Sequence, residues 1–157
     1  MNIKKIIVVL CLLATSFLSN SQKLGKGTWL VGGGLSYLNA SGANVFLGNL
    51  SGFNMVSKNI ALGANVTYIS SGSTLIAGPQ ARYYFNREKP SKFFLLSSIN
   101  FNTESSSGTF NVGAGLANFI SDYVSIDITG NYGSSFSYIS NVVSLQVGLQ
   151  IYLPKKK

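Results

Sequence analysis

Arg82 and Asp127 are the two residues whose charge and position suggest a specific interaction. Each lies on the polar side of a segment in which polar and apolar residues alternate. A guanidinium and a carboxylate in such a place form a charge-assisted hydrogen bond, which is stronger than a bond between neutral groups. We therefore predict that Arg82 and Asp127 form a charge pair inside the molecule.

The distances to neighbouring turns favour this pairing. Arg82 lies four residues before a charged turn that begins at Asn86, and Asp127 lies four or five residues after a turn at Asp122. If both turns are at the same end of the fold, the two charges lie at similar depth. Two alternatives stay open: trapped water solvates each charge separately, or a polar side chain lies between them. The polar side chains expected beside the pair are Gln80, Gln146 and Gln150.

Other reactive groups are scarce. The sequence contains no histidine, which excludes serine–histidine catalysis and histidine metal ligands. Its single cysteine, Cys11, lies in an apolar run near the N-terminus that we expect to be removed. We therefore expect no enzymatic activity, no cofactor and no metal site.

The segment Val142–Leu153 shows most clearly which elements position these residues. From Val143 onward every second residue is apolar, and the residues between are polar, glycine or tyrosine. A period of two predicts a β-strand with one apolar and one polar face. At about 3.3 Å per residue and a tilt near 45°, ten residues rise about 24 Å, roughly the apolar band of an outer membrane. The alternative is an edge strand of a long soluble sandwich.

The same alternation recurs along the chain and predicts eight strands, at residues 28–38, 45–56, 60–69, 74–85, 93–102, 109–119, 123–132 and 142–153. The second pattern is the least regular, which leaves room for a bulge or register shift. Pro79 lacks an N–H group, so it must lie at a bulge or leave one rung unmade. Bacterial single-chain barrels have an even number of strands. The predicted fold is all-β, an eight-stranded antiparallel up-and-down transmembrane β-barrel.

The composition agrees with a membrane protein made of strands. Charged residues make up 10% of the chain, against about 25% in ordinary soluble proteins. No apolar run reaches the ~20 residues of a membrane helix, and only helices and closed barrels satisfy their backbone groups in lipid. Two lysines, a 13-residue apolar run and small residues before Gln22 predict a signal peptide at residues 1–21. Residues 22–157 are then the barrel domain.

The composition of the two faces indicates which one is inside. The polar face consists of Gly, Ser, Thr, Asn and Gln with one basic and one acidic residue, which suits a closed lumen better than a wet exterior. An eight-stranded barrel is only wide enough for side chains to fill it, so we expect a filled lumen. Aromatic residues near the strand ends are expected to form girdles at the membrane interfaces. They are Trp29, Tyr37, Phe53, Tyr68, Tyr83, Phe85, Phe93, Phe101, Phe110, Phe119 and Tyr132.

Basic residues are distributed unevenly between the two ends of this barrel. Nine of the ten Lys and Arg residues after residue 21 lie at the end of the termini, including Lys92 in a turn, and the tenth is Arg82. Anionic headgroups attract basic residues near a membrane surface by about 1 kcal/mol each. We therefore expect the protein in the outer membrane, with periplasmic termini and with membrane lipids as partners. Export also removes nucleic acid as a partner.

Four short segments carry a resemblance to a known family. They are residues 27–33 (Gly-Thr-Trp-Leu-Val-Gly-Gly), residues 57–63 (Ser-Lys-Asn-Ile-Ala-Leu-Gly), Gly78-Pro79 with residues 82–85, and the closing residues 147–153. They are similar to the small outer-membrane β-barrel proteins of Gram-negative bacteria related to OmpX and the OmpA membrane domain. The resemblance implies that the barrel-assembly machinery recognises the C-terminal strand. In this family that strand usually ends on an aromatic residue, whereas Leu153 holds the position here.

Two classes of function stay open for such a barrel. One is a structural or surface-interaction barrel without a channel, whose protein partner is unknown, and the other is a narrow pore or transporter for small solutes. Large inward residues favour the first class because they would plug the lumen. These residues are Tyr84, Tyr152, Gln80, Gln146 and Gln150. A weaker alternative is a secreted subunit that assembles through its strand edges.

Overall fold

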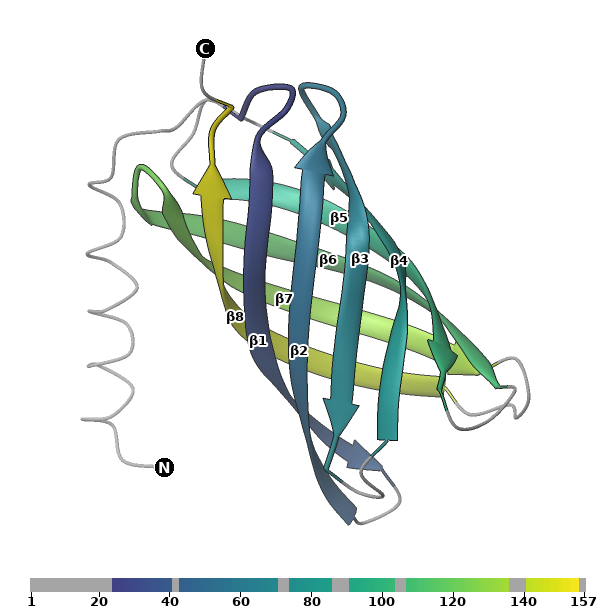
Figure 1. The fold of residues 1–157 in the computed structure, drawn as a ribbon. Helices are drawn as coiled ribbons and strands as arrows, with labels where there is room; N and C mark the ends of the chain where they lie inside the picture. Colours follow the sequence, from purple (N-terminus) through teal and green to yellow (C-terminus); the bar gives the residue numbers. More distant parts are fainter. Residues whose placement is uncertain are drawn as a thin grey trace, which may run out of the picture.

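In the computed structural model, the described part of the chain forms eight strands (Figure 1). The structure describes residues 24–40, 43–70, 74–85, 91–103, 107–135 and 141–155. The strands are β1 (Trp29–Ala40), β2 (Ala43–Met55), β3 (Ile60–Ile69), β4 (Thr74–Tyr84), β5 (Ser91–Asn102), β6 (Gly108–Ser121), β7 (Val124–Ser135) and β8 (Asn141–Leu153). The predicted signal peptide lies outside the described residues. Within those residues, no helix has the length and hydropathy needed to cross a membrane.

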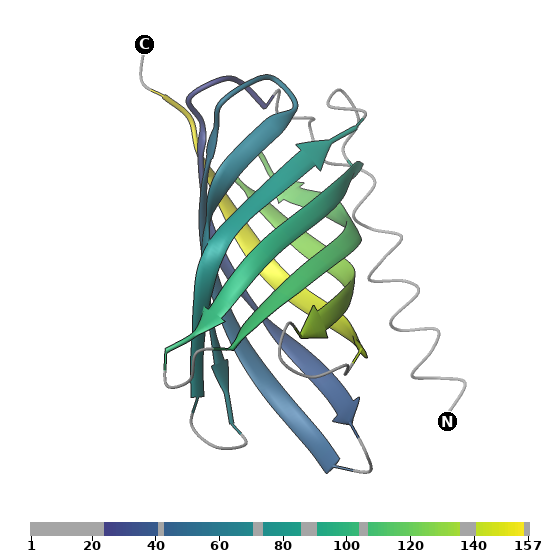
Figure 2. The same cartoon turned by 90° about the vertical axis from the view of Figure 1, so that its right-hand side faces the viewer.

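The strands close into an antiparallel barrel in which each strand pairs with the next and β8 pairs with β1. Trp29 of β1 lies opposite Asn54 of β2 on one side and Leu153 of β8 on the other. The strands are strongly tilted around the barrel, as two perpendicular views show (Figures 1 and 2). The predicted fold is confirmed. Because closure leaves no free edge among the described strands, assembly through strand edges has no edge to use.

Side chains alternate between the lumen and the outer face on every strand. On β8 the outward residues from Val143 to Leu153 are 46–75% exposed, whereas Gln150 and Tyr152 are buried. The outer face of the described barrel is therefore apolar, where a surface in water carries charge. We call the end with Trp29 and Leu153 the terminal end and the opposite end the loop end.

The eight predicted strands are present, with differences at their ends and irregularities. β2 pairs with β1 and β3 without a register shift, so it has no bulge. β4 and β5 keep one register on both sides of Pro79 but do not pair at Gly78 and Pro79, so the proline leaves rungs unmade. A register shift occurs instead between Phe119 and Ser121, where β6 runs on into the predicted turn. An extra residue there increases the local twist just before the chain reverses.

Inward-facing glycines allow neighbouring strands to curve closely around the lumen. A Cβ atom at Gly63 would collide with the carbonyl oxygen of Gly52, and one at Gly78 would collide with the carbonyl oxygen of Ile99. Only glycine is compatible with such close backbone approach. The narrow barrel that results brings side chains from opposite walls within reach of each other.

Candidate functional site in the barrel lumen

Arg82 and Asp127 meet inside the lumen. Arg82 is on β4 and Asp127 is on β7, two strands that are not neighbours in the barrel. Arg82 Nη1 lies 2.8 Å from Asp127 Oδ2, and the two side chains are 6% and 7% exposed. The distance is that of a charge-assisted hydrogen bond. The structure thus brings together the two charges that were paired from the sequence, and no glutamine separates them.

Neighbouring side chains hold both members of the pair. The Ser125 hydroxyl donates a hydrogen bond of 2.6 Å to Asp127 Oδ1. The Arg82 guanidinium lies 4.5 Å from the centroid of the Phe53 ring and 4.7 Å from that of Phe94. The negative faces of aromatic rings attract a cation at such distances. The pair is therefore anchored on both sides.

Large side chains fill the lumen from this pair to the terminal end. The rings of Tyr84 and Phe94 have centroids 5.5 Å apart, and those of Phe119 and Tyr152 are 4.6 Å apart. All four residues are fully buried. We call this region the packed half. Its buried apolar members are Leu24, Leu30, Phe53, Met55, Ala61, Tyr84, Phe94, Leu96, Ala117, Phe119 and Tyr152.

Three predictions about the terminal end are wrong. The predicted aromatic girdle includes Phe53 and Phe119, but both are fully buried in the lumen. Lys92 is not in a turn: it is the second residue of β5 and is fully buried, with Nζ 4.8 Å from the centroid of the Phe119 ring. Arg82 is therefore not the sole base in the strands. Alternation gives the reason, because Lys92 shares the lumen face of β5 with Phe94 and the girdle assignment used only nearness to strand ends.

A cavity of about 380 Å³ occupies the lumen between the pair and the loop end. Gln80 and Gln146 line this cavity, while Gln150 is almost fully buried beside Arg82 and Asp127. The expected filled lumen is thus wrong for this half, because its Asn, Ser, Thr and Gly residues are too short to meet across the barrel. Beside the charge pair the void shrinks to about 10 Å³, room for about one water molecule.

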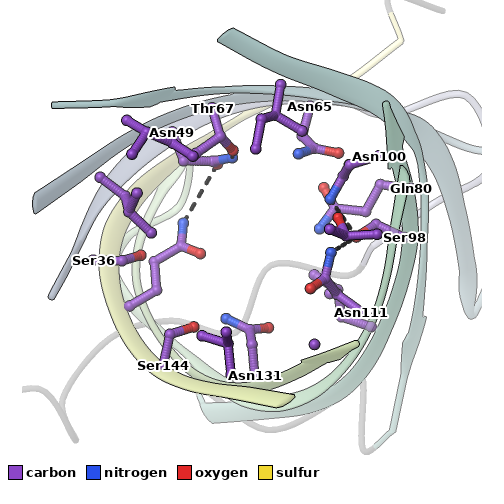
Figure 3. Close-up of a pocket in the computed structure, with 18 of the residues that line it drawn as sticks. Ser36, Asn49, Asn65, Thr67, Gln80, Ser98, Asn100, Asn111, Asn131 and Ser144 are labelled. Atoms are coloured by element: carbon purple, nitrogen blue, oxygen red, sulfur yellow. Dashed lines mark hydrogen bonds between the residues drawn. The ribbon is translucent and has the colours of Figure 1, made fainter. Parts of the chain in front are cut away.

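A belt of amide and hydroxyl groups surrounds the cavity (Figure 3). Asn49 Nδ2 donates to Thr67 Oγ1 at 2.9 Å, and Gln146 Nε2 donates to Asn49 Oδ1 at 3.4 Å. Of this polar belt, only Gln80 and Gln146 are among the residues singled out from the sequence, although all its members have the lumen parity of their strands. The polar belt consists of Ser36, Asn49, Asn65, Thr67, Gln80, Ser98, Asn100, Asn111, Asn131, Ser144 and Gln146.

Most of the other predicted interfacial aromatics lie on the outer face. Phe85, just beyond β4, is half-buried, with its ring centroid 4.8 Å from that of Tyr83 and 5.4 Å from that of Phe93. The side chain of Tyr37 lies outside the described residues. Exposed aromatics thus occur near both ends of the strands, as in interfacial girdles. They include Trp29, Tyr68, Tyr83, Phe93, Phe101, Phe110 and Tyr132.

Charged groups on the described surface are few. Lys26, Lys58 and Lys155 are exposed at the terminal end. The remaining basic residues assigned to this end, apart from Lys92, and Glu104 of the opposite loops fall outside the described residues. Within the described part of the chain, no three His, Cys, Asp or Glu residues lie close enough together to hold a metal ion.

Comparisons with solved structures identify the fold, whereas no protein-family model and no curated protein sequence matches the chain. A designed transmembrane β-barrel aligns with a TM-score of 0.69 and 15% identity, over 84% of this chain and 100% of the design. Neisserial surface protein A aligns with a TM-score of 0.59 and 18% identity, over 79% of this chain and 95% of that protein. The outer membrane protein Ail of Yersinia pestis, in a bilayer nanodisc, aligns with a TM-score of 0.53 and 13% identity, over 80% and 100%.

At 13–18% identity these likenesses concern the fold alone. They extend over almost the whole of each matched barrel, and they agree with the closed eight-strand order and the apolar outer face. The chain therefore has the fold of the small outer-membrane β-barrel proteins.

Proposed function

We propose that this protein is an integral outer-membrane β-barrel with a structural or surface-interaction role and no catalytic activity. The observation that carries the proposal is the apolar outer face of a closed barrel. Leu35 and Leu50 are each 71% exposed, and Val143 is 75% exposed. Soluble monomers rarely expose contiguous apolar patches larger than a few hundred Å², whereas hydrocarbon is a suitable surrounding for such a face. The fold shared with an outer membrane protein of Yersinia pestis supports the same location.

In this proposal residues 1–21 direct export and the termini face the periplasm. The exposed Lys26, Lys58 and Lys155 at the terminal end support this orientation, because anionic headgroups of the inner leaflet attract basic side chains. The partners are then membrane lipids and, during insertion, the barrel-assembly machinery acting on β8. A protein partner at the cell surface would bind at the loop end.

The packed half supports a role that does not depend on conduction. A solute entering from the loop end reaches the cavity and then meets the Arg82–Asp127 pair, beyond which Tyr84 and Tyr152 are fully buried. Closely packed side chains of this kind leave no continuous path for a solute. The cavity of about 380 Å³ is the one observation that favours the second candidate function, a narrow pore for small solutes.

Planar-bilayer recording of the purified protein separates the two candidate functions. We expect no conductance above that of the bare bilayer, because the packed half closes the lumen. Reproducible single-channel steps would favour the pore. A large porin reconstituted in the same lipid serves as the positive control for insertion and recording.

Location and orientation are tested separately. The mature chain should fractionate with outer membranes and migrate differently on SDS gels before and after boiling, whereas recovery from the periplasm without detergent would overturn the membrane location. With Ser135→Cys at the loop end, an impermeant thiol label should react on intact cells. Lys58→Cys at the terminal end should stay unlabelled, and the reverse pattern would overturn the orientation.

A further inference from the structure

We propose that the cavity on the loop side binds a small neutral polyol, such as the ring of a monosaccharide. Such binding requires neither the membrane location nor the absence of conduction, and so extends the function proposed above. The volume of about 380 Å³ falls within the range of about 300–1,000 Å³ typical of small-molecule sites. None of the described residues that line the cavity is charged.

Three oxygens in the cavity wall are buried without a donor. Within the described part of the chain, Asn65 Oδ1, Gln80 Oε1 and Asn100 Oδ1 have no hydrogen-bond partner. Asn65 and Asn100 are 5% and 7% exposed, and all three residues line the cavity. Buried acceptors are normally paired, because an unpaired one loses its hydration without compensation. A molecule in the cavity that supplies donors to this wall would therefore be stabilised.

Gly78 lies between two of these amides and lets their strands approach closely. It pairs with Asn65 of β3, and a Cβ atom at Gly78 would lie 2.8 Å from Asn100 Cα of β5. With adjacent strands about 4.8 Å apart, the two asparagine backbones are about 10 Å apart. No side chain at Gly78 separates the two asparagines, and Gln80 lies two residues along the same face of β4. Asn65, Gln80 and Asn100 accordingly gather on one side of the cavity (Figure 3).

Hydroxyl groups match this wall better than charged groups do. They donate to the unpartnered oxygens and also accept from the amide nitrogens of the polar belt, such as Gln146 Nε2. An anion finds no charged partner in the cavity, because Arg82, which lies nearer the terminal end, is bound to Asp127. A cation would approach the buried guanidinium of Arg82, and it finds no carboxylate among the described residues that line the cavity. Apolar residues nearer the loop end offer contacts to C–H groups, and these are Val45, Ile69, Ile76 and Val142.

The test is a titration of the ¹⁵N-labelled wild-type barrel in lipid nanodiscs, followed by NMR. The neutral probes are D-glucose and glycerol, and the matched charged probes are glucuronate and glucosamine, which keep the sugar ring. We expect saturable shifts of the Asn65 and Asn100 side-chain amide signals with the neutral probes. Binding of the charged probes should be weaker by about tenfold or more, since they lack a compensating charge in the wall.

Variants assign the effect to the two asparagines. Asn65→Leu and Asn100→Leu should each weaken glucose binding about tenfold, because each removes hydrogen-bonding groups at similar volume. Asn54→Leu, on the outer face of β2, is the matched control and should leave the affinity unchanged. The absence of saturable shifts with both neutral probes would show a cavity that holds only water and would overturn the proposal. An equal response to charged probes would also overturn it, and the wild-type titration decides this even if a leucine variant fails to fold.

Discussion

The two halves of the lumen are enclosed by the same eight strands, yet one is solid and the other is hollow. In the packed half, the rings of Phe119 on β6 and Tyr152 on β8 have centroids 4.6 Å apart. In the loop-side half, amide and hydroxyl side chains leave a cavity of about 380 Å³. An eight-stranded barrel is just wide enough for large side chains to meet. The size of the inward residues, and not a change of backbone architecture, therefore decides whether a section of the lumen is filled.

The two halves should therefore differ in how much their side chains contribute to the stability of the barrel. Substitutions in the packed half open voids, or leave charges without a partner, in a region that excludes water. Each should therefore lower the free energy of unfolding strongly. Substitutions in the polar belt alter groups that face a cavity, where water compensates for lost hydrogen bonds. The free energy of unfolding, measured by urea titration with the fluorescence of Trp29, the single tryptophan of the chain, should show this contrast.

Breaking the charge pair should have the largest effect. Arg82→Ala and Asp127→Ala should each lower the free energy of unfolding by about 3–5 kcal/mol, because each leaves one buried charge uncompensated. The double variant should lose less than the sum of the two single losses, because the pair is in direct contact. Additive losses in this double-mutant cycle would show that the contact contributes little.

Removing an aromatic ring from the packed half should lower the free energy of unfolding more than removing an aliphatic side chain from the cavity wall. Phe119→Ala should lower the free energy of unfolding by about 3 kcal/mol, because it leaves a void among buried rings. Leu47→Ala, in the cavity wall, should cost about 1 kcal/mol, because the leucine is half-buried beside an existing void. Equal losses, measured by the same urea titration, would contradict the division into two halves.

Glycines that face the lumen and the outer face should respond differently to the same change. Gly78→Ala should cost about 2 kcal/mol, because its Cβ would collide with the backbone of β5. Gly48→Ala is the matched control, because a Cβ atom there meets nothing within 4 Å. It should change the unfolding midpoint little. Similar losses in both variants would indicate that strand curvature does not depend on Gly78.

The smallest effect is expected within the polar belt. Thr67→Val removes the oxygen that accepts from Asn49 Nδ2 at 2.9 Å. The expected loss is about 0.5 kcal/mol, because water in the cavity replaces the lost acceptor. A small decrease in the urea concentration at the unfolding midpoint agrees with this expectation. A loss as large as that of Phe119→Ala would show that the belt is structural and not merely a wall around a cavity.

Several features of the fold could be predicted from the order of residues alone. Strict alternation in Val142–Leu153, and less regular alternation in seven other segments, predicted the number of strands, their faces and the apolar exterior. The reason is that side-chain direction has a period of two in any strand. The contact between Arg82 and Asp127 was predictable for a related reason. Both have lumen parity at similar depth, and a narrow lumen surrounded by an apolar face leaves them little alternative but each other.

Other features depend on the closed barrel and could not be derived from periodicity. Beginning β5 at Ser91, two residues before the predicted start, places Lys92 in the lumen. The grouping of Asn65 and Asn100 around Gly78 requires the register of three neighbouring strands. A periodic pattern determines the face on which a residue lies. Its depth, and the residues it meets across the lumen, follow from strand tilt and stagger, which closure of the whole sheet sets.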